Sequence, residues 1–427
     1  MKIRKFNITH NPFLLFLPFL ILYVAVILIF AKNISDGDEG KYLMYAQNLS
    51  QGFYTSLSNL DLGNGPGYPI IITPFVALNF SLICIKLLNA LFYYFSNILL
   101  YKALQQVVPF KFALIFSIIW ALYPNTFESM PYVLTEVFAS SLIPLIIFTL
   151  IKAFKNNNTK KALKYILFAG LSIGYLALTK PIFGYVLIFM IGGTFLLWII
   201  NVTNENLKKS IVVLIIAFFT TIPWLVCTYH ISGKMFYWSS YGGNNLYWMS
   251  SPYEGESGSW IEYPFDKIGT QIRIEGSNKI IDSLHKNDFN EINKYKGLKE
   301  DDIYKKIAIN NIKSHPFKFI KNCFSNVGRM LFNFPYSYKL QKPETLVRLP
   351  FNGIILVFIL FCIIPTVINW RKIVFPLRFL LFFSFLYFGG SILGSAETRM
   401  FTMIVPILLF WIAYTIPKSV KIKMHWQ

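Results

Sequence analysis

The sequence predicts an all-α polytopic membrane protein with about ten transmembrane helices. Of its 427 residues, 55% are hydrophobic and only 14% are charged. Apolar runs of about 20 residues recur along the chain, which is the length that crosses a hydrocarbon core about 30 Å thick. The formal net charge is +20, but the lysines and arginines concentrate in short loops between apolar runs. That placement is typical of membrane topology, and we therefore expect no nucleic-acid partner.

The N-terminal region, 1–229, is expected to be a transmembrane core of seven spans. The first span is expected over 12–31, after a basic N-terminus, and lacks the small-residue cleavage site of a signal peptide. The positive-inside rule then places the N-terminus in the cytoplasm and the following loop outside. The other spans are expected at 81–105, 110–127, 133–154, 162–179, 181–200 and 211–229.

The first outer loop, 32–69, is expected to carry an interfacial helix. Four residues at the spacing i, i+3, i+4, i+7 share one apolar stripe: Tyr42, Tyr45, Ala46 and Leu49. Such a helix lies along the membrane surface and holds the acidic residues at its start at the rim of the bundle. A Gly/Pro-rich turn, 61–69, then leads into a half-helix over 70–78.

The polar segment 230–349 is expected to form a smaller periplasmic part of mixed character, because long translocated segments largely escape the charge rule. Its clearest helix begins at Pro316, and one face of this helix is apolar: Phe317, Ile320, Phe324, Val327 and Leu331. Proline at the first position and a basic polar face predict a second interfacial helix. The C-terminal region, 350–427, is expected to add three spans, with the C-terminus in the cytoplasm.

The ionisable residues near the predicted spans gather at the outer ends: Asp36, Asp38, Glu39, Glu128, Glu136, Lys180, Glu397 and Arg399. Few charges are predicted at mid-membrane, where ion-coupled carriers keep theirs. Carboxylates opposite cations at one interface suit a reaction between a lipid-borne phosphate and a partner from outside. A carboxylate accepts a proton from an attacking hydroxyl group, and lysine or arginine holds the departing phosphate.

The acidic residues of the first loop have alternative interpretations. Asp36 followed by Glu39 resembles a capping box, and acids near a helix start also complement the helix dipole. We therefore favour Asp38 as the catalytic residue. The pattern Asp36-Gly37-Asp38 has the spacing of metal-binding DxD motifs. A divalent metal at Asp36 and Asp38 stays open, and we expect no other cofactor.

The remaining candidates have alternatives as well. Lys180 and Arg399 can anchor helix ends by snorkelling. Glu136 can orient a neighbouring cation or contact a substrate. The aromatic stretch 237–248 can stack on sugar rings or pack at the bilayer interface. The four cysteines are scattered without a ligand spacing, which favours buried hydrophobic roles.

At these residues the chain resembles the GT-C superfamily of membrane glycosyltransferases, in particular protein O-mannosyltransferases and lipid A aminoarabinose transferases. The resemblance covers nearly the whole chain, and its motifs are Asp38-Glu39 followed by Tyr42, Gly65-Pro66-Gly67-Tyr68-Pro69, Leu134-Thr135-Glu136, Leu178-Thr179-Lys180-Pro181, Gly242-Gly243-Asn244-Asn245-Leu246, His315-Pro316 and Glu397-Thr398-Arg399. Lys180 stands where relatives more often have arginine.

The resemblance implies a polyprenyl-phosphate-linked sugar as donor and an inverting transfer on the outer face. By position, the role of base or acceptor-orienting group passes to Asp38, with Glu39 beside it. Lys180 and Arg399 match cationic positions for the lipid phosphate. The same motifs place further candidate substrate contacts at Glu136, Glu397, Tyr42, Tyr68, Asn244 and Asn245.

We therefore expect a glycosyltransferase of the bacterial inner membrane that moves a sugar from a polyprenyl-phosphate carrier to a periplasmic-side acceptor, which is a lipid, a glycan or a protein. One alternative is a transporter or flippase for a lipid-linked sugar, although we find no internal repeat typical of inverted-repeat transporters. A second alternative is a polysaccharide polymerase or ligase that uses lipid diphosphate glycans. No nucleotide-sugar site is expected, because no cytoplasmic segment shows a Rossmann-type strand, glycine loop and helix.

Overall fold

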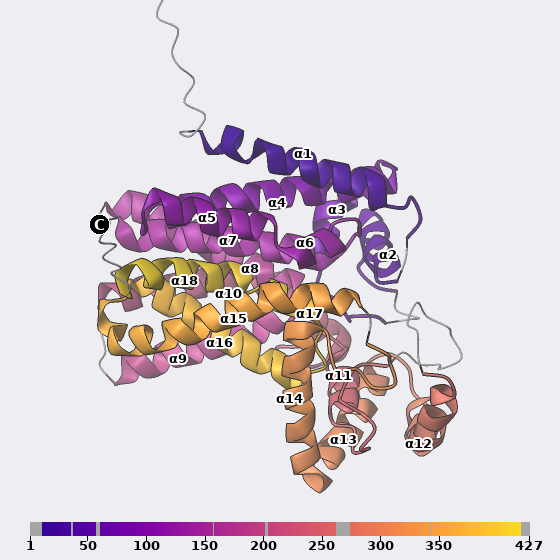
Figure 1. Ribbon diagram of the computed structural model, residues 1–427. Helices are drawn as coiled ribbons and strands as arrows, with labels where there is room; N and C mark the ends of the chain where they lie inside the picture. Colours follow the sequence, from indigo (N-terminus) through magenta and orange to yellow (C-terminus); the bar gives the residue numbers. More distant parts are fainter. Residues whose placement is uncertain are drawn as a thin grey trace, which may run out of the picture.

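The computed structural model describes residues 11–35, 37–56, 60–156, 158–200, 204–261, 274–341 and 343–419. Within these ranges the chain is helical and contains no β-strand (Figure 1). The elements, in order, are α1 (Pro12–Phe30), α2 (Glu39–Ser50), α3 (Gly67–Ala77), α4 (Leu82–Leu104), α5 (Phe110–Ala121), α6 (Pro124–Ser129), α7 (Thr135–Lys155), α8 (Thr159–Thr179), α9 (Ile182–Ile199), α10 (Glu205–Ser232), α11 (Gly242–Met249), α12 (Ser277–Ile292), α13 (Leu298–Ser314), α14 (Pro316–Phe332), α15 (Glu344–Ile368), η2 (Trp370–Lys372), α16 (Phe375–Leu393), α17 (Thr398–Thr402) and α18 (Val405–Ser419).

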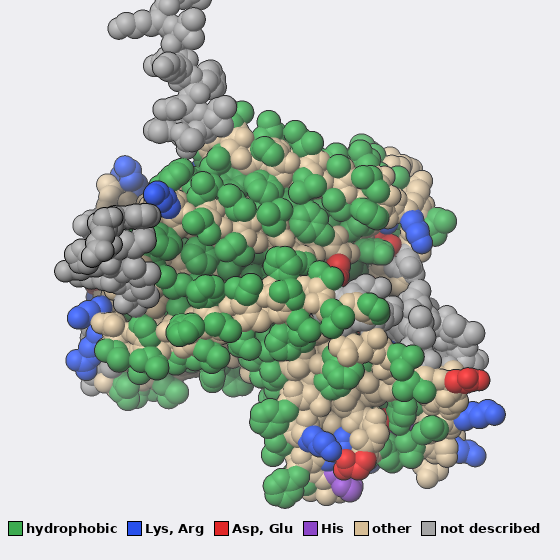
Figure 2. Space-filling model, viewed as in Figure 1, with side chains coloured by type: hydrophobic (Ala, Val, Ile, Leu, Met, Phe, Trp, Pro, Cys, Tyr) green, Lys and Arg blue, Asp and Glu red, His purple; other side chains and the backbone are tan. Residues whose placement is uncertain are grey.

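The bundle confirms the predicted polytopic membrane fold. Nine helical segments of the described chain are long and apolar enough to cross a membrane, and α18 is a shorter apolar helix that runs with them. These helices lie side by side in Figure 1, and their outward surface is densely covered by hydrophobic side chains in Figure 2. Exposed apolar surface of this extent indicates contact with lipid.

Two spans differ from their expected bounds for local reasons. The third is broken between α5 and α6, because Pro124 lacks an N–H and holds Tyr123 in an extended conformation. The seventh, α10, is longer than expected at both ends. The side chain of Asn204 accepts a hydrogen bond from the Leu207 N–H at its start, and Gly233 ends it in the left-handed conformation with φ 69°.

The loop after the first span forms the expected amphipathic helix, α2. Tyr42, Tyr45 and Ala46 on its apolar stripe are buried. The following helix, α3, begins at Gly67 and so includes Pro69, which the sequence analysis placed in the preceding turn. Proline is tolerated there because first-turn N–H groups have no intrahelical acceptor.

The Gly/Pro-rich turn packs directly on the C-terminal end of α8. A Cβ atom on Gly65 would lie 2.0 Å from the Leu178 carbonyl oxygen, and one on Gly67 would lie 2.5 Å from the Thr179 hydroxyl. No side chain larger than hydrogen fits at either position. These glycines therefore let the turn reach the segment that carries Lys180.

The polar segment between α10 and α15, called the outer segment below because the sequence predicts it outside the membrane, packs on one end of the bundle (Figure 1). It has a second hydrophobic core, separate from that of the spans, which includes Trp248, Phe289 and Tyr304. The segment also contains the expected amphipathic helix α14. Its polar face, however, is turned into the protein, with Lys318 and Arg329 buried.

Candidate functional site at one end of the spans

Arg399 is the centre of a charged cluster that joins distant parts of the chain. It lies on α17, the short helix between α16 and α18. Its Nη1 atom is 3.1 Å from the Asp38 Oδ2 atom at the start of α2. Its Nε atom is 3.1 Å from Glu397 Oε2 and 3.5 Å from Glu136 Oε1. One guanidinium therefore contacts three of the predicted site carboxylates.

Glu136 links this arginine to the other predicted cation. The Lys180 Nζ atom donates to Glu136 Oε1 at 2.6 Å. Lys180 is the residue that ends α8, and Glu136 lies in the first turn of α7. The side chain of Glu136 is only 3% exposed, whereas that of Lys180 is 17% exposed. Glu136 is thus the buried carboxylate between two cations that reach toward solvent.

Tyr42 and Thr135 extend the cluster inward. The Thr135 hydroxyl donates to Glu136 Oε2 at 3.3 Å, and the Tyr42 hydroxyl lies 3.3 Å from the Thr135 hydroxyl. Tyr42 also donates to Asn64 at 3.3 Å. Burial raises the pKa of Tyr42, and the nearby Glu136 carboxylate adds to the shift. This phenol therefore stays protonated at neutral pH.

The open part of the cluster contains Asp38, Glu397 and Arg399. Their side chains are 42%, 36% and 32% exposed. The Asp38 side chain makes no capping hydrogen bond to α2, so it is not occupied as a helix cap in the described structure. The carboxylates of Glu136, Glu397 and Asp38 raise the pKa of Arg399, which therefore stays charged.

Glu39, the neighbour of Asp38, lies in a different environment. Its Oε1 atom is 3.0 Å from the Lys86 Nζ atom of α4, and both side chains are only 1% exposed. The same oxygen accepts the Val133 N–H at 2.7 Å, and Lys86 donates to the Lys32 carbonyl oxygen. Glu39 thus fastens α2 to α4. Lys86 was not among the residues predicted from the sequence, although a single lysine inside the apolar run 81–105 is a signal for a buried ion pair.

The remaining sequence candidates are divided between the cluster and the outer segment. The Tyr68 ring packs edge-on against Tyr42 at 5.8 Å, and its buried hydroxyl has no hydrogen-bond partner among the described residues. Asn244 lies on α11, where its side chain accepts from the Trp260 indole N–H at 3.2 Å. Neither Asn244 nor Asn245 has a hydrogen bond to the cluster in the described part of the chain. The contacts therefore draw Tyr68 toward the cluster and place the two asparagines in the outer segment.

A second guanidinium, Arg348, was also missed by the sequence analysis. It lies in the first turns of α15 and pairs through Nη2 with Glu128 of α6. Its side chain is 10% exposed, and its Nε and Nη1 atoms have no hydrogen-bond partner within the described ranges. The charges of Arg348 and of the cluster both act on Tyr336. Burial raises the pKa of Tyr336, Glu397 raises it further, and Arg348 and Arg399 both oppose the rise.

No three His, Cys, Asp or Glu side chains group as metal ligands in the described part of the chain. Asp36 is predicted as a possible metal ligand together with Asp38, and as a catalytic candidate together with Asp38 and Glu39. It lies outside the described residues. The Asp38 carboxylate contacts the Arg399 guanidinium.

Solved structures of other proteins share the fold of this chain, although its sequence matches no family model. No protein-family model matches the chain, and no curated protein sequence matches it. The oligosaccharyltransferase of Archaeoglobus fulgidus in its apo form matches over 94% of this chain at 14% identity, with a TM-score of 0.52. The chain has a GT-C fold. The resemblance noted in the sequence is thereby confirmed at the level of the fold.

Two ligand-bound structures match as well. The archaeal oligosaccharyltransferase AglB from Archaeoglobus fulgidus, in complex with an inhibitory peptide and a dolichol-phosphate, matches over 95% of this chain at 13% identity, with a TM-score of 0.50. ArnT from Cupriavidus metallidurans, bound to undecaprenyl phosphate, matches over 94% of this chain and 78% of its own at 9% identity, with a TM-score of 0.43. The chain spans about half the length of the archaeal enzyme, 50% in both archaeal structures named here.

Proposed function

We propose that this protein is a membrane glycosyltransferase that moves a sugar from a polyprenyl-phosphate carrier to an acceptor on the periplasmic side of the bacterial inner membrane. The observation that carries the proposal is the contact of Arg399 with Asp38, Glu136 and Glu397, beside Lys180, at one end of the spans. The GT-C fold supports it, and so does the dolichol-phosphate in the archaeal complex that shares the fold.

A site at the rim of the bundle suits an amphipathic substrate, with a lipid tail and a polar head. A polyprenyl tail stays in hydrocarbon, whereas a phosphosugar needs water and cationic partners. Arg399 and Lys180 supply charge-assisted donors for the phosphate, in the manner typical of arginine and lysine sites. The buried Glu136 holds both cations in place, because it contacts Arg399 and Lys180 together.

Asp38 is the proposed base. The acceptor hydroxyl oxygen attacks the anomeric carbon, the bond from that carbon to the phosphate oxygen breaks, and Asp38 takes the hydroxyl proton. Attack from the face opposite the phosphate inverts the anomeric configuration. The products are the glycosylated acceptor and the polyprenyl phosphate.

The ion pair between Asp38 and Arg399 couples proton transfer to loss of the leaving group. As Asp38 gains a proton, its negative charge disappears and its hold on the Arg399 guanidinium weakens. The same guanidinium then stabilises the phosphate charge that develops on the opposite side. The main anionic partner of Arg399 thus changes from Asp38 to the phosphate.

Arg348 is a proposed additional contact for the carrier phosphate. Its two unpartnered donor nitrogens are buried, and unsatisfied buried donors cost about 1–3 kcal/mol each. An anionic group that accepts from them removes this cost. Leu346 and Val347, beside it on α15, are apolar and exposed, which supports a position of this guanidinium at the lipid-facing margin of the bundle.

The test uses purified protein in detergent with polyprenyl-phosphate sugars extracted from bacterial membranes and with an extract of periplasmic acceptors, and follows release of polyprenyl phosphate by mass spectrometry. We expect release from the wild type and a rate about 10²–10⁴-fold lower from Asp38→Asn. Detergent abolishes vectorial transport but not catalysis, so binding of the carrier without release would favour a flippase. Release of polyprenyl diphosphate would favour an enzyme that uses lipid diphosphate glycans.

A further inference from the structure

Helix α14 presents its apolar face outward. Three large side chains on this face are highly exposed: Phe317 at 85%, Ile320 at 50% and Phe324 at 74%. A surface helix in water normally buries this stripe and exposes its polar side. The orientation of α14 therefore needs an apolar medium or partner on its outer side.

The opposite face of α14 is polar, buried and fully engaged with the outer segment. Lys318 donates to the Glu256 carbonyl oxygen at 2.5 Å and to Asn322 Oδ1 at 2.8 Å. Asn322 in turn donates to the carbonyl oxygens of Met249 and Ser251, both at 3.0 Å. These bonds fix which side of the helix faces the protein.

Farther along the same face, Asn326 holds the segment that carries Arg399. Its side-chain nitrogen donates to the carbonyl oxygens of Ser391 at 3.0 Å and Gly394 at 2.5 Å, and its oxygen accepts the Ala396 N–H at 3.0 Å. Ala396 directly precedes Glu397, and Arg399 follows two residues later. One asparagine of α14 thus fixes both ends of the turn before the charged cluster.

Arg329 adds a second connection from α14. It donates to the carbonyl oxygens of Ser257 at 2.8 Å, Gly258 at 3.0 Å and Pro335 at 3.0 Å, and reaches that of Ala396 at 3.4 Å. Burial lowers the pKa of Arg329 to about 10, which leaves it charged at neutral pH. A buried guanidinium held by so many carbonyl oxygens allows α14 little independent movement.

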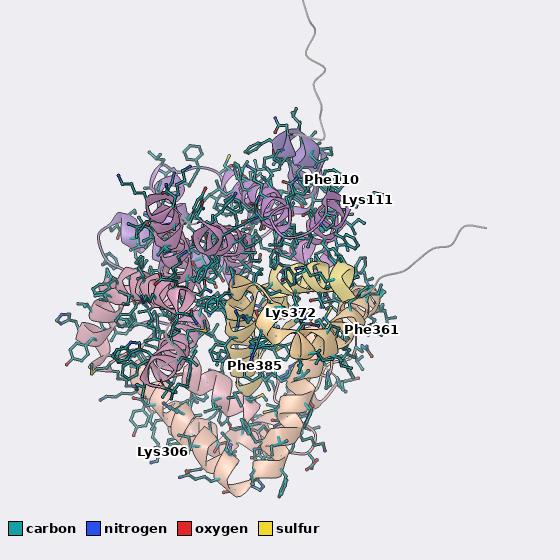
Figure 3. The ribbon with its side chains drawn as sticks, turned by 90° about the vertical axis from the view of Figure 1, so that its left-hand side faces the viewer. Phe110, Lys111, Lys306, Phe361, Lys372 and Phe385 are labelled. Atoms are coloured by element: carbon teal, nitrogen blue, oxygen red, sulfur yellow. The ribbon has the colours of Figure 1, made fainter. Side chains whose placement is uncertain are left out.

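The direction of α14 identifies the medium that covers its apolar face. In Figure 1 the helix runs across the direction of the spans and extends beyond the bundle, and in Figure 3 the α13–α14 pair projects from one side of it. Phe385 of α16, which is 71% exposed, lies on the side of the bundle from which this pair projects in the view of Figure 3. Figure 2 shows hydrophobic side chains along the left edge of the projecting part, the side toward which the spans extend. That edge faces the slab of bilayer that must surround the spans.

We propose that α14 lies in the outer leaflet of the bilayer, with Phe317, Ile320 and Phe324 in contact with acyl chains, and that this contact seats the segment 394–399 through Asn326 and Arg329. Burial of these three side chains in lipid supplies the hydrophobic stabilisation that water would withhold. The bilayer then acts as a structural partner of the charged cluster.

The lipid contact is tested on the wild-type protein in nanodiscs that contain a phospholipid with a diazirine in its acyl chain. After illumination, we expect mass spectrometry to find adducts at 317–324 and none on α12, which is the internal control in the same outer segment. Absence of adducts at 317–324 would overturn the contact. If a bound protein shielded 317–324 from the lipid label instead, the face would belong to a protein partner, and the proposed lipid contact would be overturned equally.

The seating of the 394–399 segment is tested by hydrogen exchange, which requires no substrate and is independent of the proposed function. The double variant Phe317→Ser/Phe324→Ser changes only exposed side chains, so the fold is expected to persist. We expect faster amide exchange at 395–403 in the variant than in the wild type. A matched change on α12, Lys286→Ser, should leave exchange at 395–403 unchanged. Equal exchange at 395–403 in the wild type and the double variant would overturn the coupling.

Discussion

Asp38 and Glu39 are adjacent in sequence but belong to two physically different regions. Asp38 is 42% exposed and contacts an arginine that is itself partly open to solvent. Glu39 is 1% exposed and contacts Lys86, which is equally buried. An exposed pair contributes about 0–1 kcal/mol to stability, whereas loss of one partner from a buried pair costs about 3–5 kcal/mol. We therefore propose a chemical role for Asp38 and a role in fold stability for Glu39.

The sharpest way to separate the two regions is Asp38→Asn. This change keeps the shape of the side chain but removes the charge and the basic oxygen. Loss of a general base typically costs about 10²–10⁴-fold in rate, so we expect transfer to fall by that amount with expression and thermal stability unchanged. The measurement is the initial rate of polyprenyl phosphate release per folded protein. A rate near that of the wild type would remove Asp38 from the mechanism.

The matched change in the buried region is Glu39→Gln, which leaves Lys86 buried without a counter-charge. We expect a loss of about 3–5 kcal/mol in the free energy of unfolding, measured by denaturant unfolding in detergent. The control is the double variant Glu39→Gln/Lys86→Met, which removes the orphaned charge and should recover part of the loss. If Glu39→Gln lost activity but not stability, the division between the two carboxylates would be wrong.

A smaller effect is expected at Arg348. Arg348→Gln removes two buried donors that are available to the carrier phosphate, and a hydrogen bond to a charged group contributes about 1.5–3 kcal/mol. We therefore expect affinity for polyprenyl phosphate to fall by about tenfold or more, as measured by native mass spectrometry. Glu128→Gln is the control, because it keeps the guanidinium and should not weaken binding. Unchanged affinity in Arg348→Gln would exclude this residue from the phosphate site.

The smallest effect lies in the outer segment, at Asp301. Its carboxylate accepts the N–H groups of Gly243 and Asn244 at the start of α11. Burial nevertheless raises its pKa from 3.8 to about 6. The folded state thus holds this proton more tightly than the unfolded state, so the contribution to stability is full at acidic pH and is lost as the pH rises through about 6.

The thermal stability of the wild type should therefore include a component that declines between pH 5 and pH 7. Asp301→Asn cannot titrate and should lose this component, which a comparison of melting temperatures at the two pH values measures. An identical pH dependence in the variant would show that the titration of Asp301 does not control it.

The fold was largely predictable because hydropathy and the distribution of lysine report directly on membrane spans. The outer-end carboxylates and cations were predictable for the same reason, and the structure brings Asp38, Glu136, Lys180, Glu397 and Arg399 together. Hydropathy gives the depth of a residue in the membrane but not its partner. For that reason the sequence could not predict that Asp38 pairs with Arg399 whereas its neighbour Glu39 pairs with Lys86.

Two features were beyond the sequence for a related reason. The pairing of Arg348 with Glu128 joins positions 220 residues apart, and no local pattern reports such a contact. The amphipathic character of α14 was visible, but the side that faces the protein depends on acceptors supplied by other elements, such as the carbonyl oxygens of Ser391 and Gly394. Periodicity defines two faces of a helix and leaves open which face is buried.

The central claim is that a lipid-borne phosphate binds at the arginine that contacts Asp38. An experimental structure of the protein with polyprenyl phosphate in a nanodisc tests it most directly. The account predicts a phosphate oxygen about 3 Å from the Arg399 guanidinium, with Lys180 alongside and the lipid tail running into the bilayer. A phosphate bound elsewhere, with the contact between Arg399 and Asp38 intact, would contradict it.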